Sequence, residues 1–162
     1  MSSEPDLSQS VSQLPELSCV LIPTAGYQLL LPNVSVAEIL PWRRIKPIEN
    51  TDPWCLGVLG WRGESVPVVR FEELVTPSDK ARRTGRCLVV MNRSHSVRSK
   101  PFWALAADGL PRMLQLDAED VGESARTPNA AESACVSLGS EEASIPNLAY
   151  LEECINKLPN LG

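Results

Sequence analysis

The sequence contains few of the residues that commonly carry catalysis or bind metals. There is one histidine, His95, in a polar segment, and the five cysteines form no C-x-x-C pair. A zinc site needs several closely spaced Cys or His ligands, and a cysteine nucleophile needs a nearby base, so neither is indicated. The phosphate-binding patterns G-x-x-x-x-G-K-[ST] and G-x-G-x-x-G are also absent. We therefore expect a protein that is not an enzyme and holds no metal or cofactor.

Long apolar runs are absent as well. No segment approaches the roughly 20 apolar residues of a membrane-spanning helix, and residues 1–17 lack the basic and apolar regions of a signal peptide. The odd number of cysteines does not suggest the disulfide framework of a secreted protein. Cys19 and Cys87 lie in apolar runs, where a thiol serves as a small core residue. These features predict a cytoplasmic protein without membrane insertion.

The charge is negative overall and unevenly distributed. The formal net charge is −5, which does not favour general attraction to nucleic acid. Residues 79–100 nevertheless carry seven Lys or Arg and one acid. A solvated loop is the favoured interpretation of this segment, and a patch that docks an acidic partner is the other. A second hypothesis for the whole protein is a nucleic-acid-binding small barrel that uses residues 80–100, with Trp61 or Trp103 as a stacking platform.

Most of the sequence consists of short apolar runs separated by proline, glycine and charged residues. This pattern predicts nine or ten short strands and an all-β barrel or sandwich, and the number suits two small barrels. Residues 71–75 are predicted as a short helix. We expect a disordered tail over residues 1–17, one folded unit over 18–158 and a short tail over 159–162. The predicted strands include 18–23, 27–32, 34–40, 55–61, 66–69, 87–92, 101–108, 110–116, 134–139 and 143–146.

The C-terminal segment carries the clearest helical pattern. Asn147 is a suitable N-cap, and Leu148, Leu151, Ile155 and Leu158 recur at helical spacing. The helix is therefore predicted to pack its leucine face against a barrel.

Tryptophan supplies four of the eight aromatic residues, at positions 42, 54, 61 and 103. A core position is expected for most of them, because the indole combines a large apolar area with one N–H. Trp61 is predicted to be the exception, since it adjoins Arg62 and Gly63, and Trp and Arg are frequent interface residues. Gly57, Gly60 and Gly63 supply the backbone freedom that turns or bulges require.

Two stretches together resemble the signature of the CheW-like family. They are "LPNVSVAEIL" and "DPWCLGVLGWRGESVPVVRFEEL", and the later "FWALAADGLPRML" is similar to the strand pair in the family's second half. The resemblance spans residues 18 to 158. The matching positions in the first half are Val36, Glu38, Ile39, Gly57, Val58, Arg62, Gly63, Pro67 and Val68.

This resemblance implies a fold of two interleaved five-stranded SH3-like barrels packed together, with a C-terminal helix. It implies an adaptor that joins the cytoplasmic tips of chemoreceptors to the regulatory domain of a CheA-type histidine kinase. Departures from the family pattern, such as Trp61 in place of Leu and Arg70-Phe71 in place of Asp-Leu, favour an accessory adaptor of a pilus-linked system that controls twitching motility. The partner-binding residues implied are Val36, Glu38, Ile39, Gly57, Trp61, Arg62 and Gly63.

The resemblance also predicts local geometry. Gly57 and Gly63 are expected to shape turns, and Val58 with residues 66–69 to fill the first barrel. Glu38 interrupts an apolar strand face, so we expect it to pair with Arg62 at the edge of that barrel, near the groove between the barrels. Trp61 is then expected to pack against a receptor helix.

Overall fold

The computed structural model describes residues 17–78, 83–92 and 102–158. His95, both predicted tails apart from residue 17, and most of the basic segment lie outside the described residues. The elements are β1 (Leu17–Thr24), β2 (Tyr27–Pro32), η1 (Asn33–Ser35), β3 (Val36–Pro41), β4 (Cys55–Trp61), β5 (Glu64–Val69), α2 (Phe71–Val75), β6 (Cys87–Asn92), β7 (Phe102–Ala107), β8 (Arg112–Leu116), η2 (Ala118–Asp120), β9 (Gly122–Glu123), β10 (Glu132–Leu138), β11 (Glu141–Pro146) and α3 (Leu148–Asn156).

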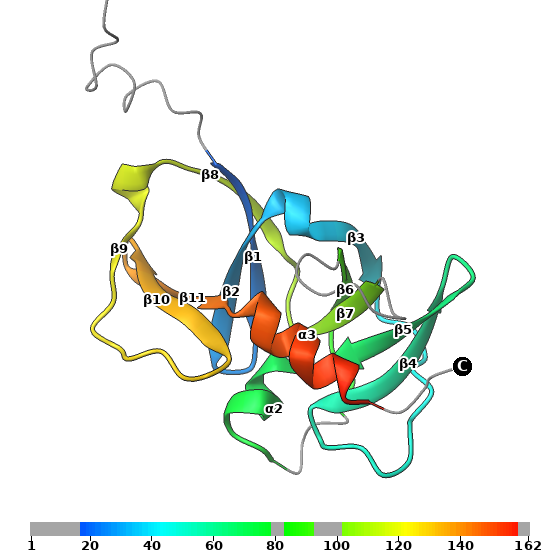
Figure 1. Cartoon of the computed structure of the whole chain (residues 1–162). Helices are drawn as coiled ribbons and strands as arrows, with labels where there is room; N and C mark the ends of the chain where they lie inside the picture. Colours follow the sequence, from blue (N-terminus) through cyan, green and yellow to red (C-terminus); the bar gives the residue numbers. More distant parts are fainter. Residues whose placement is uncertain (1–16, 79–82, 93–101, 159–162) are drawn as a thin grey trace, which may run out of the picture.

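The strands form two sheets whose sequences interleave. One sheet has the order β8-β1-β2-β11-β10-β9 and combines both ends of the described chain, and we call it the terminal barrel. The other has the order β3-β6-β7-β5-β4 and uses the middle of the chain, and we call it the central barrel. Figure 1 shows the two side by side, with α3 crossing in front of both. The all-β prediction of two SH3-like barrels is confirmed, with the two-residue β9 as a sixth strand of the terminal barrel.

Three hydrophobic cores account for the apolar runs of the sequence. A shared core lies between the two sheets, and each barrel also has an interior core. On β6, Val89 faces the shared core while Leu88 and Val90 face the interior of the central barrel. On β1, Val20 and Ile22 face the shared core, and the alternate residues face the interior of the terminal barrel. These strands are apolar on both faces because both faces are buried.

The first hairpin and the thiol positions follow the predictions. In the β1–β2 hairpin Thr24 pairs with Tyr27 across a two-residue turn, and Gly26 takes a φ of 83° that favours glycine. Cys19 and Cys87 are buried, and this burial raises the pKa of both thiols.

β3 departs from the predicted strand. Its first predicted residues form the 3-10 turn η1, and Val34 there is 85% exposed. The pairing of β3 with β6 shifts between Val36 and Glu38, so a bulge interrupts the simple alternation of faces. The strand predicted over residues 34–40 therefore begins later than expected, at Val36.

Helix α3 closes the shared core. The Asn147 side chain accepts a hydrogen bond from the Tyr150 amide at 3.1 Å, as predicted for an N-cap. Leu151 and Ile155 are fully buried in the shared core, and Leu148 and Leu158 pack on it while remaining partly exposed. The helix thus covers residues that come from both barrels.

Replacing Leu151 with alanine is expected to lower the free energy of unfolding by about 2–5 kcal/mol, because it removes a buried leucine from a closed core. Glu153→Ala on the exposed side of the same helix should change stability by no more than about 0.5 kcal/mol. Denaturant unfolding of the two variants measures the difference. Equal stabilities would mean that α3 is an appendage rather than part of the core.

Candidate functional site

Glu38 connects the two edge strands of the central barrel. Its Oε1 atom accepts a hydrogen bond from Trp61 Nε1 at 2.8 Å and another from Arg62 Nη2 at 3.2 Å. Glu38 lies on β3 and Trp61 at the end of β4, and these two strands are the opposite ends of the five-stranded sheet. The carboxylate therefore bridges the seam where the central barrel closes.

The ion pair between Glu38 and Arg62 is exposed. The side chains are 38% and 68% exposed, respectively. The Arg62 guanidinium also lies 4.7 Å from the centre of the Trp61 ring, which holds it over the indole face. The predicted pair between Glu38 and Arg62 is therefore present in the structure. Because both side chains contact solvent, the pair contributes no more than about 1 kcal/mol to stability.

Trp61 is a core residue, so the expectation that its ring packs against a receptor helix is wrong. It is 5% exposed, belongs to the interior core of the central barrel, and packs edge-on against Phe102 with ring centres 4.9 Å apart. The alternation of β4 directs Leu59 and Trp61 inward and Gly60 outward. The indole N–H bonds Glu38, and the exposed Arg62 side chain covers the ring.

Arg62 and Gly63 form the tight turn between β4 and β5. Trp61 pairs with Glu64, and the two turn residues have φ angles of 48° and 77°. Two positive φ angles in a two-residue hairpin loop match the twist of the flanking strands. The predicted turn role of Gly63 is therefore correct, and the same turn raises Arg62 into solvent.

Gly57 lies inside β4 and not in a turn, which corrects the prediction. Its φ is 136°, at an irregularity in the pairing of β4 with β5. A Cβ atom there would lie 2.1 Å from the carbonyl oxygen of Lys46. The Lys46 and Val58 backbones exchange hydrogen bonds of 2.9 and 2.8 Å beside it, so the absence of a side chain lets residue 46 approach β4.

The residues predicted to fill the first barrel divide between cores. Val66 and Val68 lie in the interior of the central barrel, whereas Val69 faces the shared core. Val58 is only half-buried and belongs to neither core, so its predicted role is wrong. The alternation that directs Leu59 and Trp61 inward places Val58 on the opposite face of β4, where its backbone pairs with Lys46.

The structure brings most of the predicted site residues to one edge of the central barrel. Glu38, Arg62 and Gly63 meet at the seam, and the neighbouring Ile39 on β3 is 40% exposed. Val36 is partly buried and packs on the shared core. Trp61 supports this surface from inside. Gly57 acts through the backbone and presents no side chain to a partner.

The two tryptophans that the nucleic-acid hypothesis offers for base stacking, Trp61 and Trp103, are both buried. Trp103 is 1% exposed and faces the shared core, and Trp61 is buried as described above. Arg83, from the basic segment, makes ion pairs of 2.9 Å with Glu72 and 2.7 Å with Asp108. Its charge is thus already balanced within the protein.

A buried ionic cluster was not predicted from the sequence. Arg70 is fully buried and contacts Glu72 at 3.0 Å, Asp108 at 3.2 Å and the Arg83 carbonyl at 2.6 Å. The cluster joins the start of α2, the chain before β6 and the turn after β7. The only sequence signal was a charge, Arg70, placed directly after an apolar strand, because its partners lie far along the chain.

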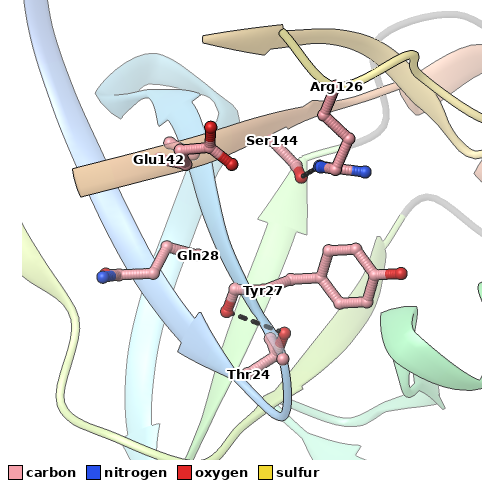
Figure 2. Close-up of a pocket in the computed structure, with 8 residues that line it drawn as sticks. Thr24, Tyr27, Gln28, Arg126, Glu142 and Ser144 are labelled. Carbon is pink, nitrogen blue, oxygen red and sulfur yellow. Dashed lines mark hydrogen bonds between the residues drawn. The ribbon is translucent and has the colours of Figure 1, made fainter. Parts of the chain in front are cut away.

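A small polar cavity of about 260 Å³ opens between β2 and β11 (Figure 2). Arg126 lies at its edge and contacts the buried Glu132 through hydrogen bonds of 2.9 and 2.5 Å, and Ser144 donates a further short hydrogen bond to Glu132. Burial alone would raise the pKa of Glu132, but the hydrogen bonds from Arg126, Ser144 and the Asn129 amide lower it to about 2. Because Glu132 neutralises Arg126, we assign this arrangement to the stability of the terminal barrel.

Within residues 17–78, 83–92 and 102–158, no group of three or more His, Cys, Asp or Glu side chains is arranged to hold a metal ion. In the same residues, no helix has both the length and the apolar character needed to cross a membrane.

The fold is that of two interleaved SH3-like barrels. The crystal structure of scaffolding protein TtCheW from Thermoanaerobacter tengcongensis superposes with a TM-score of 0.64, covering 83% of this chain and 86% of that chain at 15% sequence identity. The family model of the CheW-like domain matches residues 18–151, and the chain belongs to this family. It is a CheW-like adaptor domain of chemotaxis signalling. No curated protein sequence matches the chain.

Gly57→Ala is expected to destabilise the protein by about 3 kcal/mol or more, because the new methyl group meets a backbone oxygen and the φ angle is unfavourable. Gly63→Ala is the matched control, since no atom lies within 4 Å of its Cβ position. The control should lose only about 1–2 kcal/mol for its left-handed backbone. Thermal or denaturant unfolding measures both, and equal losses would disprove the close approach at Gly57.

The Glu132 cluster predicts acid sensitivity. A carboxylate whose pKa is lowered on folding stabilises the protein above its unfolded pKa of about 4.3, and this stability is lost as the pH falls towards the folded value. The parent should therefore lose stability between about pH 4.5 and pH 2. Glu132→Gln should be less stable at pH 7 and lose less over this acid range. Parallel unfolding curves from pH 7 to pH 2 test this, and identical pH profiles would contradict the assignment.

Proposed function

We propose that this domain is a non-enzymatic cytoplasmic adaptor that couples the cytoplasmic tip of a chemoreceptor to the regulatory domain of a CheA-type histidine kinase. The exposed edge of the central barrel, built around Glu38 and Arg62, is the proposed receptor-binding surface. The observation that supports it most is the Glu38–Arg62 pair, which is well oriented and yet largely exposed. Membership of the CheW-like family and the resemblance described for the sequence support the choice of partners.

The orientation of the pair favours recognition over stability. Glu38 is held by the Trp61 N–H from within the barrel, and Arg62 rests on the indole ring, so both charges have defined positions before any partner arrives. An exposed pair adds little to folding, as argued above. Arg62 has five N–H donors, and among the residues that the structure describes it uses one of them on Glu38, so the others are proposed to bind the partner.

The neighbouring apolar residues suit a helical partner. Ile39 is exposed beside Glu38, and Val36 is partly exposed on the same strand. An amphipathic helix that lies on such a surface buries its apolar face and places polar groups against the charged edge. The helical tip of a chemoreceptor fits this chemistry.

The association with a pilus-linked system that controls twitching motility is the finer part of the proposal. It rests on the departures from the family pattern at Trp61 and Arg70. Trp61 is tied to the proposed surface through Glu38, whereas Arg70 belongs to the buried ionic cluster. A difference at Trp61 therefore bears on which receptor is recognised, and Arg70 bears on the fold.

Arg62→Ala should leave the unfolding free energy within about 1 kcal/mol of the parent and weaken co-purification of the chemoreceptor by tenfold or more, as for an interface hot spot. Arg112→Ala is the matched control, because Arg112 forms an exposed pair of 2.9 Å with Glu141 on the terminal barrel. The control should keep receptor binding.

The protein with the charges exchanged, Glu38→Arg with Arg62→Glu, should have neither the stability of the parent nor its receptor binding. Glu38 also accepts the Trp61 N–H, and an arginine at position 38 cannot replace that acceptor. If Arg62→Ala and the exchanged protein both bind receptor and kinase like the parent, the proposed surface is wrong.

A further inference from the structure

A second cavity, of about 480 Å³, lies away from the Glu38–Arg62 surface and shares no residue with it. Three segments line it: the loop of residues 50–54, helix α2 with the residues that follow it, and helix α3 with the two residues that follow it. We call it the loop–helix pocket. In Figure 1, α2 and the loop that leads into β4 lie in the lower part of the molecule, below α3.

The floor of the loop–helix pocket is formed by partly exposed side chains at the margin of the shared core. Trp54, Leu74, Tyr150 and Leu158 line the pocket, and all four pack on the shared core while remaining partly exposed. An apolar side chain placed here would therefore extend the core and bury aromatic surface that water now contacts. Tryptophan and tyrosine in a concave setting are typical of the anchoring sites of protein interfaces.

The walls of the pocket are held by hydrogen bonds before any partner binds. The Trp54 carbonyl accepts from the Arg70 amide at 2.8 Å, and the Trp54 indole donates to Asp52 Oδ2 at 3.3 Å. On the opposite wall the Glu73 carboxylate accepts from the Ser78 amide and hydroxyl at 2.7 and 2.6 Å. Rigid walls reduce the entropy that a binding partner must offset.

The charges around the pocket are mainly negative. Asp52 and Glu73 line it together with one lysine, Lys157, and Glu153 lies beside it on the exposed side of α3. Burial raises the pKa of the Cys154 thiol in the pocket. The hydrogen bond with Tyr150 and the charge of Lys157 act to lower this pKa, and the charges of Glu153 and Asp52 act to raise it. Three carboxylates against one ammonium group favour a cationic neighbour.

We propose that the loop–helix pocket docks a partner protein segment that inserts a large apolar side chain, leucine or phenylalanine, with a lysine or arginine beside it that faces Asp52. The apolar floor and the exposed charges Asp52 and Lys157 reproduce the apolar centre and polar rim of a protein interface. A small-molecule site of this volume would instead be expected to enclose its ligand and to direct polar groups inward.

Cys154 provides a direct measurement. Two short peptides serve as probes, acetyl-Lys-Leu-Phe-Lys-amide and acetyl-Glu-Leu-Phe-Glu-amide, and the rate of Cys154 alkylation is followed by mass spectrometry on the full chain. The half-buried Cys135 on the terminal barrel is the internal reference. The basic peptide should slow alkylation of Cys154 by about tenfold at ten times its Kd, through simple occupancy, without slowing that of Cys135. The acidic peptide should protect Cys154 at least fivefold less at the same concentration.

Variants of α3 test the location. Cys154→Trp fills the pocket and should abolish binding of the fluorescently labelled basic peptide in an anisotropy titration. Ala149→Trp places the same side chain on an exposed position of the same helix, outside the lining of the pocket, and should bind like the parent. Thermal unfolding verifies that both are folded. Asp52→Lys at an exposed position gives a second route, and it should shift the preference towards the acidic peptide.

Three results would overturn the proposal. One is equal or absent protection of Cys154 by the two peptides, and another is unchanged peptide binding by Cys154→Trp. The third is protection by an uncharged apolar compound such as benzyl alcohol with no preference between the peptides, which would indicate a small-molecule site.

Discussion

The shared core between the two sheets is the constraint on which the rest of the structure depends. Strands β1, β2, β6 and β7 each give one face to this core and the other to a barrel interior. Neither barrel can therefore bury its strands alone, and α3 completes the burial with Leu151 and Ile155. Because the middle of the chain forms one barrel and both of its ends form the other, the two must assemble around this common layer.

Closure of the central barrel creates the proposed receptor-binding surface. The Glu38 carboxylate joins the two edge strands by accepting hydrogen bonds from Trp61 and Arg62. The close approach of Lys46 to Gly57 holds the chain that follows β3 against β4. Glu38 and Arg62 thus bridge the seam and also carry the charges of the proposed surface. A defect in closure would displace these charges, although their own pairing adds little to stability.

The charged groups of the protein separate into two physical classes. Arg70 and Glu132 are buried and surrounded by several partners, as desolvated charges require. Arg62 and Arg112 are exposed, each with one carboxylate, and contribute little to folding. This difference in burial, more than the number of contacts, separates charges that hold the fold together from charges that remain available to a partner.

The sequence by itself determined the strand-length apolar runs, the Asn147-capped helix, the Arg62-Gly63 turn and the pairing of Glu38 with Arg62, because these depend on local chemistry and a recognisable family pattern. It could not determine which face of β6 or β7 meets which core, since a strand buried on both sides has no alternation to interpret. It also could not decide that Trp61 points inward, because an indole suits a core and an interface equally. Gly57, Arg70 and the loop–helix pocket depend on residues far away in the chain, such as Lys46, Asp108 and Tyr150. Only the tertiary structure brings those residues together, because their contacts exist only once both barrels have packed on the shared core.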